Sequence, residues 1–283
     1  GALLMALTGC VSTPPTLGDA PPGYRDERQE LGYQTVLEKY TDRAELYSGF
    51  EADPPRLWRW LSLALESVLA RRADAVVTVS EPISAELASR LRLERRPLVV
   101  LNCPACEDVE VESRPGSPVR AIYQAAVGPG RMLDDVVEAA RMAPEVELTV
   151  RLLGGDGVPL PGIRVEPPVP PDRLVTALAP YDIGLVIDRP LTDNARLALP
   201  NKLFEYLMAG LAVAVPRAPA MAALVEEHGV GIVYDHGGLG AALQRLASDR
   251  EKLDAMRRRA RELAVTRFNA EAQRPNLLRA WGL

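Results

Sequence analysis

The sequence predicts an α/β protein with parallel sheets, helices on both faces of each sheet, and two domains. Short apolar runs alternate along the chain with helical segments, which is the order of βαβ units. The chain has 283 residues, more than a typical single domain. Residues 103–118 contain three prolines and show no hydrophobic period. We therefore expect an N-terminal domain over residues 1–104, a linker over 105–118 and a C-terminal domain over 119–283.

Composition argues against several classes of function. The net charge is −5, which is unlike a general nucleic-acid binder, and aromatic residues, at 5%, are too few for base-stacking platforms. No apolar run approaches the length of a membrane span. Three cysteines do not make a disulfide framework. We expect a globular protein of a reducing compartment without a nucleic-acid partner.

The sequence offers weak candidates for a metal site. Cys103 and Cys106 form a single CxxC inside the predicted linker, and His228 and His236 are the only histidines. A redox or zinc site of this kind normally needs a second ligand pair or a thioredoxin-like unit. We therefore predict no metal.

The N-terminal domain is predicted from a few short segments. Residues 1–10 (GALLMALTGC) resemble a bacterial lipoprotein cleavage box ending at Cys10, but no basic residue precedes the apolar stretch. We expect a helix from a truncated domain there, with a lipoprotein anchored at Cys10 as the alternative. The other elements expected are a strand around 34–40, a helix over 55–72, a strand over 75–79, a helix capped by Ser80 and a strand over 97–102.

The C-terminal domain has a more regular pattern. Strands are expected over 119–124, 146–153, 163–165, 182–187, 211–215 and 230–234, with helices over 132–142, from Pro171, over 200–210, after 215 and over the last fifty residues or so. In parallel sheets of this kind, ligands bind beyond the carboxyl ends of the strands. The loops 125–131 and 188–200 lie at such ends, and so does the start of the helix at Pro200.

The helix that begins at Pro200 carries the most informative charges. Its free N–H groups and dipole favour an anion, and Lys202 adds a full positive charge in the first turn. Glu205 lies one turn further on, on the same side as Lys202. A carboxylate there could accept hydrogen bonds from a vicinal diol, as in the ribose of a nucleotide diphosphate. A simple surface pair between Lys202 and Glu205 explains the same residues equally well.

The loop AAVGPGR, residues 125–131, offers a second candidate. Gly128 and Gly130 permit close approach of the backbone to a ligand, and Arg131 could fork onto phosphate oxygens. The spacing matches neither the dinucleotide fingerprint nor the P-loop. Taken alone, an ordinary surface loop is the better interpretation.

Several segments together resemble a known family. PNKLFEYLMAGLAVAV (200–215) resembles the signature of retaining GT-B glycosyltransferases of family 4, in the PNKLFEY variety. AIYQAAVGPGRMLDDVVEAA (121–140) resembles the strand, phosphate loop and helix that open the second domain of that family. The other matching segments are ADAVVTVSEPISAEL (73–87), VVLNCP (99–104), PPVPPDRL (167–174), YDIGLV (181–186) and GVGIVYD (229–235). The resemblance covers residues 57–283 and is densest after 119.

This resemblance implies a GT-B-like fold of two Rossmann-like domains, the N-terminal one incomplete. It implies a nucleotide diphosphate sugar as donor, a saccharide or lipid-linked acceptor, and no metal or cofactor. By position, Glu205 matches the glutamate that holds the ribose hydroxyls, and Arg131 matches the basic residue on the donor diphosphate. Residues near the phosphates, the sugar or the base would be Lys202, Asn201, Pro200, Leu199, Gly128 and Val169.

The chain also departs from the family pattern. Leu197 stands where many members have a second glutamate, Ala125 and Ala126 stand where glycine is common, and Ala44 stands where a histidine is usual. The first domain is short as well. Two functions therefore remain open: a retaining glycosyltransferase, or a catalytically silent nucleotide-binding relative.

Basic residues suggest where such a protein would work. Arginines cluster over residues 90–96 and 257–261, and a basic helical face could rest on anionic lipid, although solvated faces are the simpler interpretation. We expect a cytoplasmic protein, with peripheral contact at the inner membrane face as an alternative. The oligomeric state is not predicted.

Overall fold

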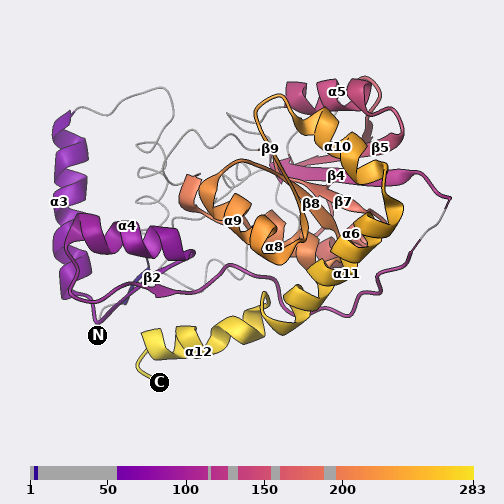
Figure 1. Ribbon diagram of the computed structural model, residues 1–283. Helices are drawn as coiled ribbons and strands as arrows, with labels where there is room; N and C mark the ends of the chain where they lie inside the picture. The colour runs from indigo at the N-terminus through magenta and orange to yellow at the C-terminus, as the bar shows by residue number, and fades with distance from the viewer. Residues whose placement is uncertain (1–2, 6–55, 114–115, 127–132, 154–159, 188–195) are drawn as a thin grey trace.

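The computed structural model describes residues 3–5, 56–113, 116–126, 133–153, 160–187 and 196–283 (Figure 1). The strand predicted around 34–40, the site residues Gly128 and Arg131, the alternative anchor Cys10 and the departure at Ala44 lie outside these residues. The described chain forms two parallel sheets with helices packed against them. This is the α/β class that the sequence predicts.

The first sheet has three described strands in the order β1-β2-β3, which are β1 (Leu3–Met5), β2 (Ala75–Thr78) and β3 (Leu98–Val99). Helices α3 (Arg56–Arg72) and α4 (Glu81–Leu91) accompany it. As predicted, Ser80 caps α4, because its Oγ accepts a hydrogen bond from the backbone N–H of Ile83 at 3.2 Å. The cluster under these helices contains Ala70, Val79, Ile83, Leu87 and Leu91.

The expected helix at the start of the chain is wrong at Leu3–Met5. These residues form a strand parallel to β2, with Leu3 opposite Ala75 and Met5 opposite Val77. A short apolar run fits a buried strand as well as a helix, and periodicity alone does not separate the two. The neighbouring strand decides the outcome.

The second sheet has six strands in the order β6-β5-β4-β7-β8-β9, all parallel. They are β4 (Val119–Ala126), β5 (Val146–Leu153), β6 (Arg164–Glu166), β7 (Ile183–Leu185), β8 (Ala212–Pro216) and β9 (Gly231–Tyr234). The sequence placed each of them to within about two residues. The clearest difference is β4, which continues through Ala125 and Ala126, where the sequence predicts a loop.

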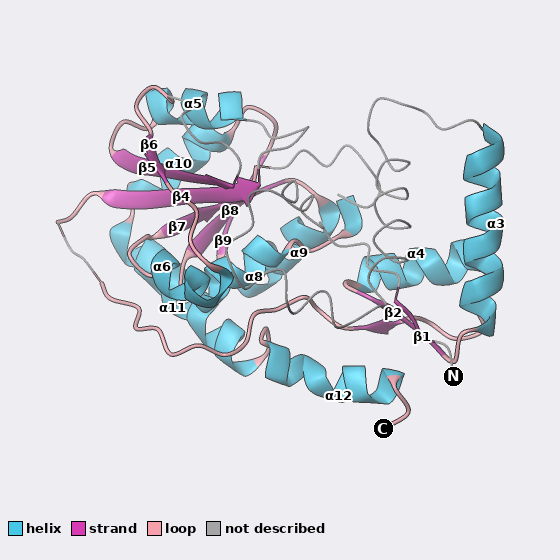
Figure 2. Cartoon of the chain, turned by 180° about the vertical axis from the view of Figure 1, so that it is seen from behind, coloured by secondary structure: helices cyan, strands magenta, loops and turns pink. Residues whose placement is uncertain are grey.

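Helices cover both faces of this sheet (Figure 2). They are α5 (Leu133–Met142), α6 (Leu174–Leu178) after a 3₁₀ turn (Pro171–Arg173), α8 (Asn201–Met208), α9 (Pro219–His228), α10 (Leu239–Ala247), α11 (Arg250–Thr266) and α12 (Ala270–Ala280). One core lies between the sheet and α8, α9 and α11, and includes Phe204 and Leu207. The other lies under α5 and α10, and includes Val136 and Leu243. Because both faces are covered, the central strands β7 and β8 are apolar throughout.

The predicted linker packs along α11. Arg257 donates to the carbonyl of Glu112 at 2.9 Å, Arg261 donates to the carbonyl of Glu107, and Val109 is 9% exposed. Arg257 is itself buried and pairs with Asp182 at 3.1 Å. The basic cluster over 257–261 is therefore partly internal and does not form one lipid-facing surface.

The last helix returns to the first sheet (Figure 1). In α12, the Asn276 amide donates to the carbonyl of Val99 at 3.0 Å, and Gln273 accepts from the backbone N–H of Leu101 at 3.2 Å. The C-terminal helix α12 therefore connects the first sheet to the part of the chain that forms the second sheet. None of the described helices combines the length and the apolar character that a membrane span requires.

Candidate functional site

The candidate site is built around the start of α8, at the carboxyl edge of the second sheet. The helix forms because Leu203, Phe204, Leu207 and Met208 are all fully buried on its inner side, as the sequence predicts. Pro200 precedes it in an extended conformation and makes no side-chain cap hydrogen bond. In the first turn the Leu203 N–H donates to the Pro200 carbonyl at 3.0 Å, and the positive end of the helix dipole favours an anion at this helix start.

Glu205 is held by a residue that the sequence analysis missed. The Gln124 amide nitrogen in β4 donates to Oε2 of Glu205 at 2.9 Å. Burial raises the pKa of Glu205, whereas the Gln124 hydrogen bond and the charge of Lys202 lower it. The carboxyl group is thus partly withdrawn from water and directed towards the carboxyl end of β4.

Tyr206 locks α8 onto the sheet beneath this carboxylate. Its hydroxyl accepts from the backbone N–H of Gln124 at 3.2 Å and donates to the carbonyl of Leu185 at 3.2 Å. The ring lies directly on β7, where a Cβ at Gly184 would come within 2.3 Å of Tyr206 Cγ. Gly184 therefore allows α8 to approach closely, and the two hydrogen bonds fix the height of Glu205 above the strands.

Lys202 contacts an aromatic ring, a neighbour that the sequence analysis did not name. Its ammonium lies 5.0 Å from the centroid of the Tyr123 ring, in a cation–π contact. Glu205 instead takes its hydrogen bond from Gln124, and Lys202 acts on it through charge alone. Lys202 thus lies close enough to Glu205 for its charge to lower the pKa of that carboxyl group, while Gln124 supplies the hydrogen bond.

The first sheet faces the start of α8. The Asn102 side chain, just after β3, donates to Oδ1 of Asn201 at 2.7 Å, and the Ser80 hydroxyl donates to the carbonyl of Leu197 at 2.7 Å. Ala198 packs in the cluster under α3 and α4. The carboxyl ends of both sheets therefore meet at residues 197–201, where the sequence predicted donor contacts.

The remaining predicted residues are dispersed. Leu199 and Pro200 are buried in the turn before α8. Val169 is partly buried in the segment between β6 and Pro171. Gly128 and Arg131 lie outside the described residues, so their roles stay predictions.

Gln124 and Asn102 could have been suspected from one signal. Each is a polar residue at the carboxyl end of an apolar strand, where ligand-binding side chains collect in parallel sheets. Their partners are 81 and 99 residues away in sequence, so spacing does not reveal them.

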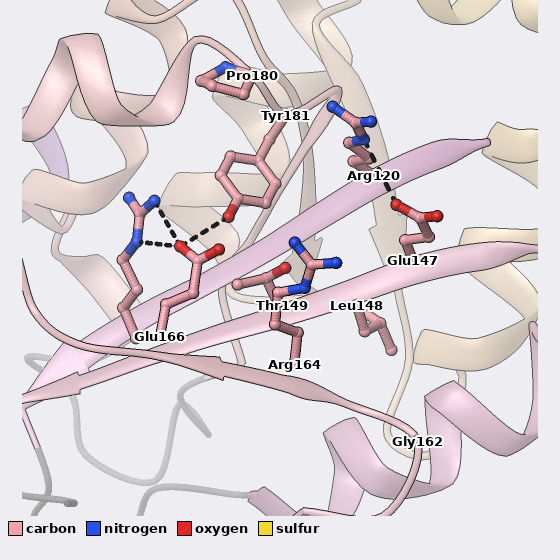
Figure 3. Close-up of a pocket in the computed structure, with 10 residues that line it drawn as sticks. Arg120, Glu147, Leu148, Thr149, Gly162, Arg164, Glu166, Pro180 and Tyr181 are labelled. Carbon is pink, nitrogen blue, oxygen red and sulfur yellow. Dashed lines mark hydrogen bonds and ion pairs between the residues drawn. The ribbon is translucent and has the colours of Figure 1, made fainter. Parts of the chain in front are cut away.

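A cavity of about 520 Å³ lies beside the first halves of β4 and β5 (Figure 3). Its charges are largely paired with one another. Arg151 and the Tyr181 hydroxyl both donate to Oε2 of Glu166, and Arg120 lies 3.4 Å from Glu147. Glu205 and Gln124 do not line this cavity, so the cavity is not part of the site described above.

Cys103 is partly buried beside α12, and this burial raises its pKa to about 12. Its thiol is therefore protonated at neutral pH and is a poor nucleophile or metal ligand. Among the residues that the structure describes, no three metal-ligating side chains gather in one place.

Comparison with protein families identifies the second unit. Residues 131–279, which span α5 to α12 and include Glu205, match a family described as glycosyl transferase-like. The chain belongs to this family. Its glycosyl transferase-like region thus contains α8 and five of the six strands of the second sheet. A search of curated proteins found no match.

Solved structures show the same GT-B-like fold at low identity. TarM from S. aureus, in complex with fondaparinux, α-GlcNAc-glycerol and UDP, has 10% identity and a TM-score of 0.62 over 78% of this chain and 46% of TarM. HepE from Anabaena, in complex with UDP and glucose, has 14% identity and a TM-score of 0.61 over 78% of this chain and 67% of HepE.

A third structure is sucrose-phosphate synthase from Thermosynechococcus elongatus. It has 14% identity and a TM-score of 0.66 over 83% of this chain and 64% of the synthase. This glycosyl transferase-like chain therefore spans about half the length of TarM and about two thirds of the other two. At these identities the likeness shows the fold alone.

Proposed function

We propose that the chain binds a nucleotide diphosphate sugar and transfers the sugar to a saccharide or lipid-linked acceptor, as a retaining glycosyltransferase of family 4. The observation that carries this proposal is the partly buried Glu205, held by Gln124 close to the start of α8. A carboxylate there suits a ribose diol, and the helix start suits the diphosphate. TarM and HepE, which share the fold, are seen with UDP.

The proposed roles follow the position of each residue. Glu205 holds the ribose, while Arg131 and Lys202 act as the catalytic cations that receive the diphosphate. Leu199, Pro200 and Asn201 form the backbone turn that meets the phosphates and the sugar. Gly128 lets the loop approach, and Val169 borders the base. The proposal needs neither a metal nor another cofactor.

Transfer with retention then requires little chemistry from side chains. The bond between the sugar C1 and the leaving phosphate oxygen breaks, and the acceptor oxygen bonds to C1 on the same face. The proton of the acceptor hydroxyl passes to the leaving phosphate. The protein contributes orientation and stabilisation of the phosphate charge.

A second candidate is a nucleotide-binding module without turnover. β4 continues through Ala125 and Ala126, so two side chains and a paired strand occupy positions where the family pattern has a glycine-containing loop. This shortens the segment that can wrap around the diphosphate. Such a module would support an active partner.

A panel of UDP- and GDP-sugars separates the two candidates. The transferase proposal predicts release of the nucleotide from at least one donor, measured as free UDP or GDP, with the anomeric configuration of the product retained. Arg131→Ala should reduce this release, and should weaken binding of diphosphates more than of nucleosides. Donor binding without release of nucleotide or transfer to any acceptor would support the silent module.

A further inference from the structure

The buried side chain of Gln124 carries a polar atom that the fold leaves without a partner. Gln124 is 9% exposed and lies near the carboxyl end of β4. Its amide nitrogen donates to Glu205 at 2.9 Å, but its amide oxygen, Oε1, is buried and receives no hydrogen bond from the described residues. Nearly all buried polar atoms in folded proteins are hydrogen-bonded. An orphaned oxygen in contact with a candidate ligand-binding carboxylate therefore points to a ligand.

The neighbouring carboxylate fixes the orientation of this amide. Turning the amide over would place its oxygen against Oε2 of Glu205, and two acceptor oxygens repel each other. The nitrogen must therefore face Glu205, and the oxygen must face away from it. The backbone of Gln124 has no freedom to adjust, because its N–H is bonded to the Tyr206 hydroxyl at 3.2 Å. The free oxygen is a consequence of how β4 and α8 are joined.

Glu205 leaves a second acceptor beside the first. Gln124 donates to its Oε2, and no described residue donates to its Oε1. The positive charge of Lys202 and the Gln124 hydrogen bond both favour the ionised carboxylate, against the effect of burial on its pKa. Two side chains in contact thus offer a ligand two acceptor oxygens. A vicinal diol is complementary to them, since it carries two O–H donors on adjacent carbons.

We propose that Gln124 is a nucleotide-binding residue that orients Glu205 through its amide nitrogen and accepts a hydrogen bond from one ribose hydroxyl through its amide oxygen. This inference rests on the proposed function, which assigns the ribose to Glu205, and it adds the second acceptor of the diol. A nucleotide without the matching hydroxyl leaves a buried oxygen unpaired. Gln124 therefore also selects ribonucleotides.

The test is calorimetric binding of UDP, 2′-deoxy-UDP and 3′-deoxy-UDP, with the three guanosine diphosphates measured in parallel. Gln124→Met keeps the length of the side chain and removes the amide. It should weaken UDP or GDP binding about tenfold. Wild type should bind one of the two deoxy analogues more weakly by a similar factor. Gln124→Met should then bind that analogue no more weakly than wild type does.

A double-mutant cycle separates direct contact from an effect through Glu205. In a Glu205→Ala background, Gln124→Met should still weaken UDP or GDP binding, because the amide oxygen meets the ribose itself. Thr149→Val, a buried polar-to-apolar change on β5, should leave binding unchanged. Thermal unfolding identifies a variant that does not fold, and Gln124→Leu then replaces Gln124→Met.

The outcomes distinguish this inference from the function on which it rests. An equal loss for all three nucleotides, no loss, or a loss that vanishes in the Glu205→Ala background would overturn the ribose contact of Gln124. If wild type binds but Glu205→Ala binds equally well, the ribose assignment of Glu205 fails. If wild type binds none of the nucleotides, both proposals fail.

Discussion

Glu205 occupies the second turn of α8, where packing against β4 partly removes it from water. Burial raises the pKa of its carboxyl group above the usual 4.5. The folded protein therefore retains this proton at pH values where the unfolded chain has lost it. The folded state is penalised as the pH rises from 4.5 through the raised pKa, and the full penalty is present above it. A group kept at such a cost fits a role in binding.

Glu205→Gln should therefore raise the Tm at neutral pH, by on the order of a few degrees, while weakening nucleotide binding. The difference in Tm between the variant and wild type should be small near pH 4.5, should grow as the pH rises and should then become constant. Differential scanning calorimetry across this range measures it.

The matched control is Glu262→Gln, which changes an exposed carboxyl group on α11. It should leave the Tm nearly unchanged at every pH. A Glu205→Gln variant that is less stable than wild type at neutral pH would show that the carboxylate stabilises the fold, contrary to this account.

Single residues also show what the sequence could and could not predict. Glu205, Asn201 and Pro200 were predicted as site residues from the helix start and from family resemblance, because these signals are local in the chain. The sequence left open whether Lys202 pairs with Glu205, because a spacing of three allows contact but does not require it. In the structure the ammonium lies over the Tyr123 ring. Gln124 was missed because its contact joins β4 to α8.

Among the elements, α11 contacts both the second sheet and the predicted linker through Arg257. Arg257 is 1% exposed, and its guanidinium contacts Asp182 at 3.1 Å, Asp254 at 3.2 Å and the carbonyl of Glu112 at 2.9 Å. Asp182 is 1% exposed and directly precedes β7. One side chain thus connects the helix, the sheet and the predicted linker.

Arg257→Met should destabilise the protein by about 3 kcal/mol, because it leaves Asp182 and Asp254 buried with one less cation. Urea unfolding measures the change in the free energy of unfolding. Arg259→Met, on the same helix, removes an exposed i, i+3 pair with Glu262 and should change it by less than about 0.5 kcal/mol. Similar small effects of both variants would contradict this connecting role of Arg257.

Element boundaries were predictable where the hydrophobic period is clear, as for β5 and α8. The form of Leu3–Met5 was not, since these three apolar residues take it from pairing with β2. Residues 105–113 were read as a free linker because they are polar and lack period. Their packing depends on Arg257 and Arg261, which lie about 150 residues further along the chain.

At the scale of the whole molecule, two parallel sheets present their carboxyl ends to residues 197–201. Asn102 and Ser80 approach from the first sheet, and Glu205 and Gln124 lie on the second. The α/β class followed from the alternation of strands and helices. The strand order β6-β5-β4-β7-β8-β9 could not be read from local patterns, because it depends on which crossovers pack on which face.

The central claim is that the edge of the second sheet beside α8 binds a nucleotide diphosphate through Glu205. Isothermal titration calorimetry with UDP and GDP, on wild type and on folded Glu205→Ala, tests it most directly. We predict that wild type binds at least one of the two, and that Glu205→Ala binds it about tenfold or more weakly, since a hydrogen bond to a charged group is lost. Equal affinity in the two proteins would contradict the claim.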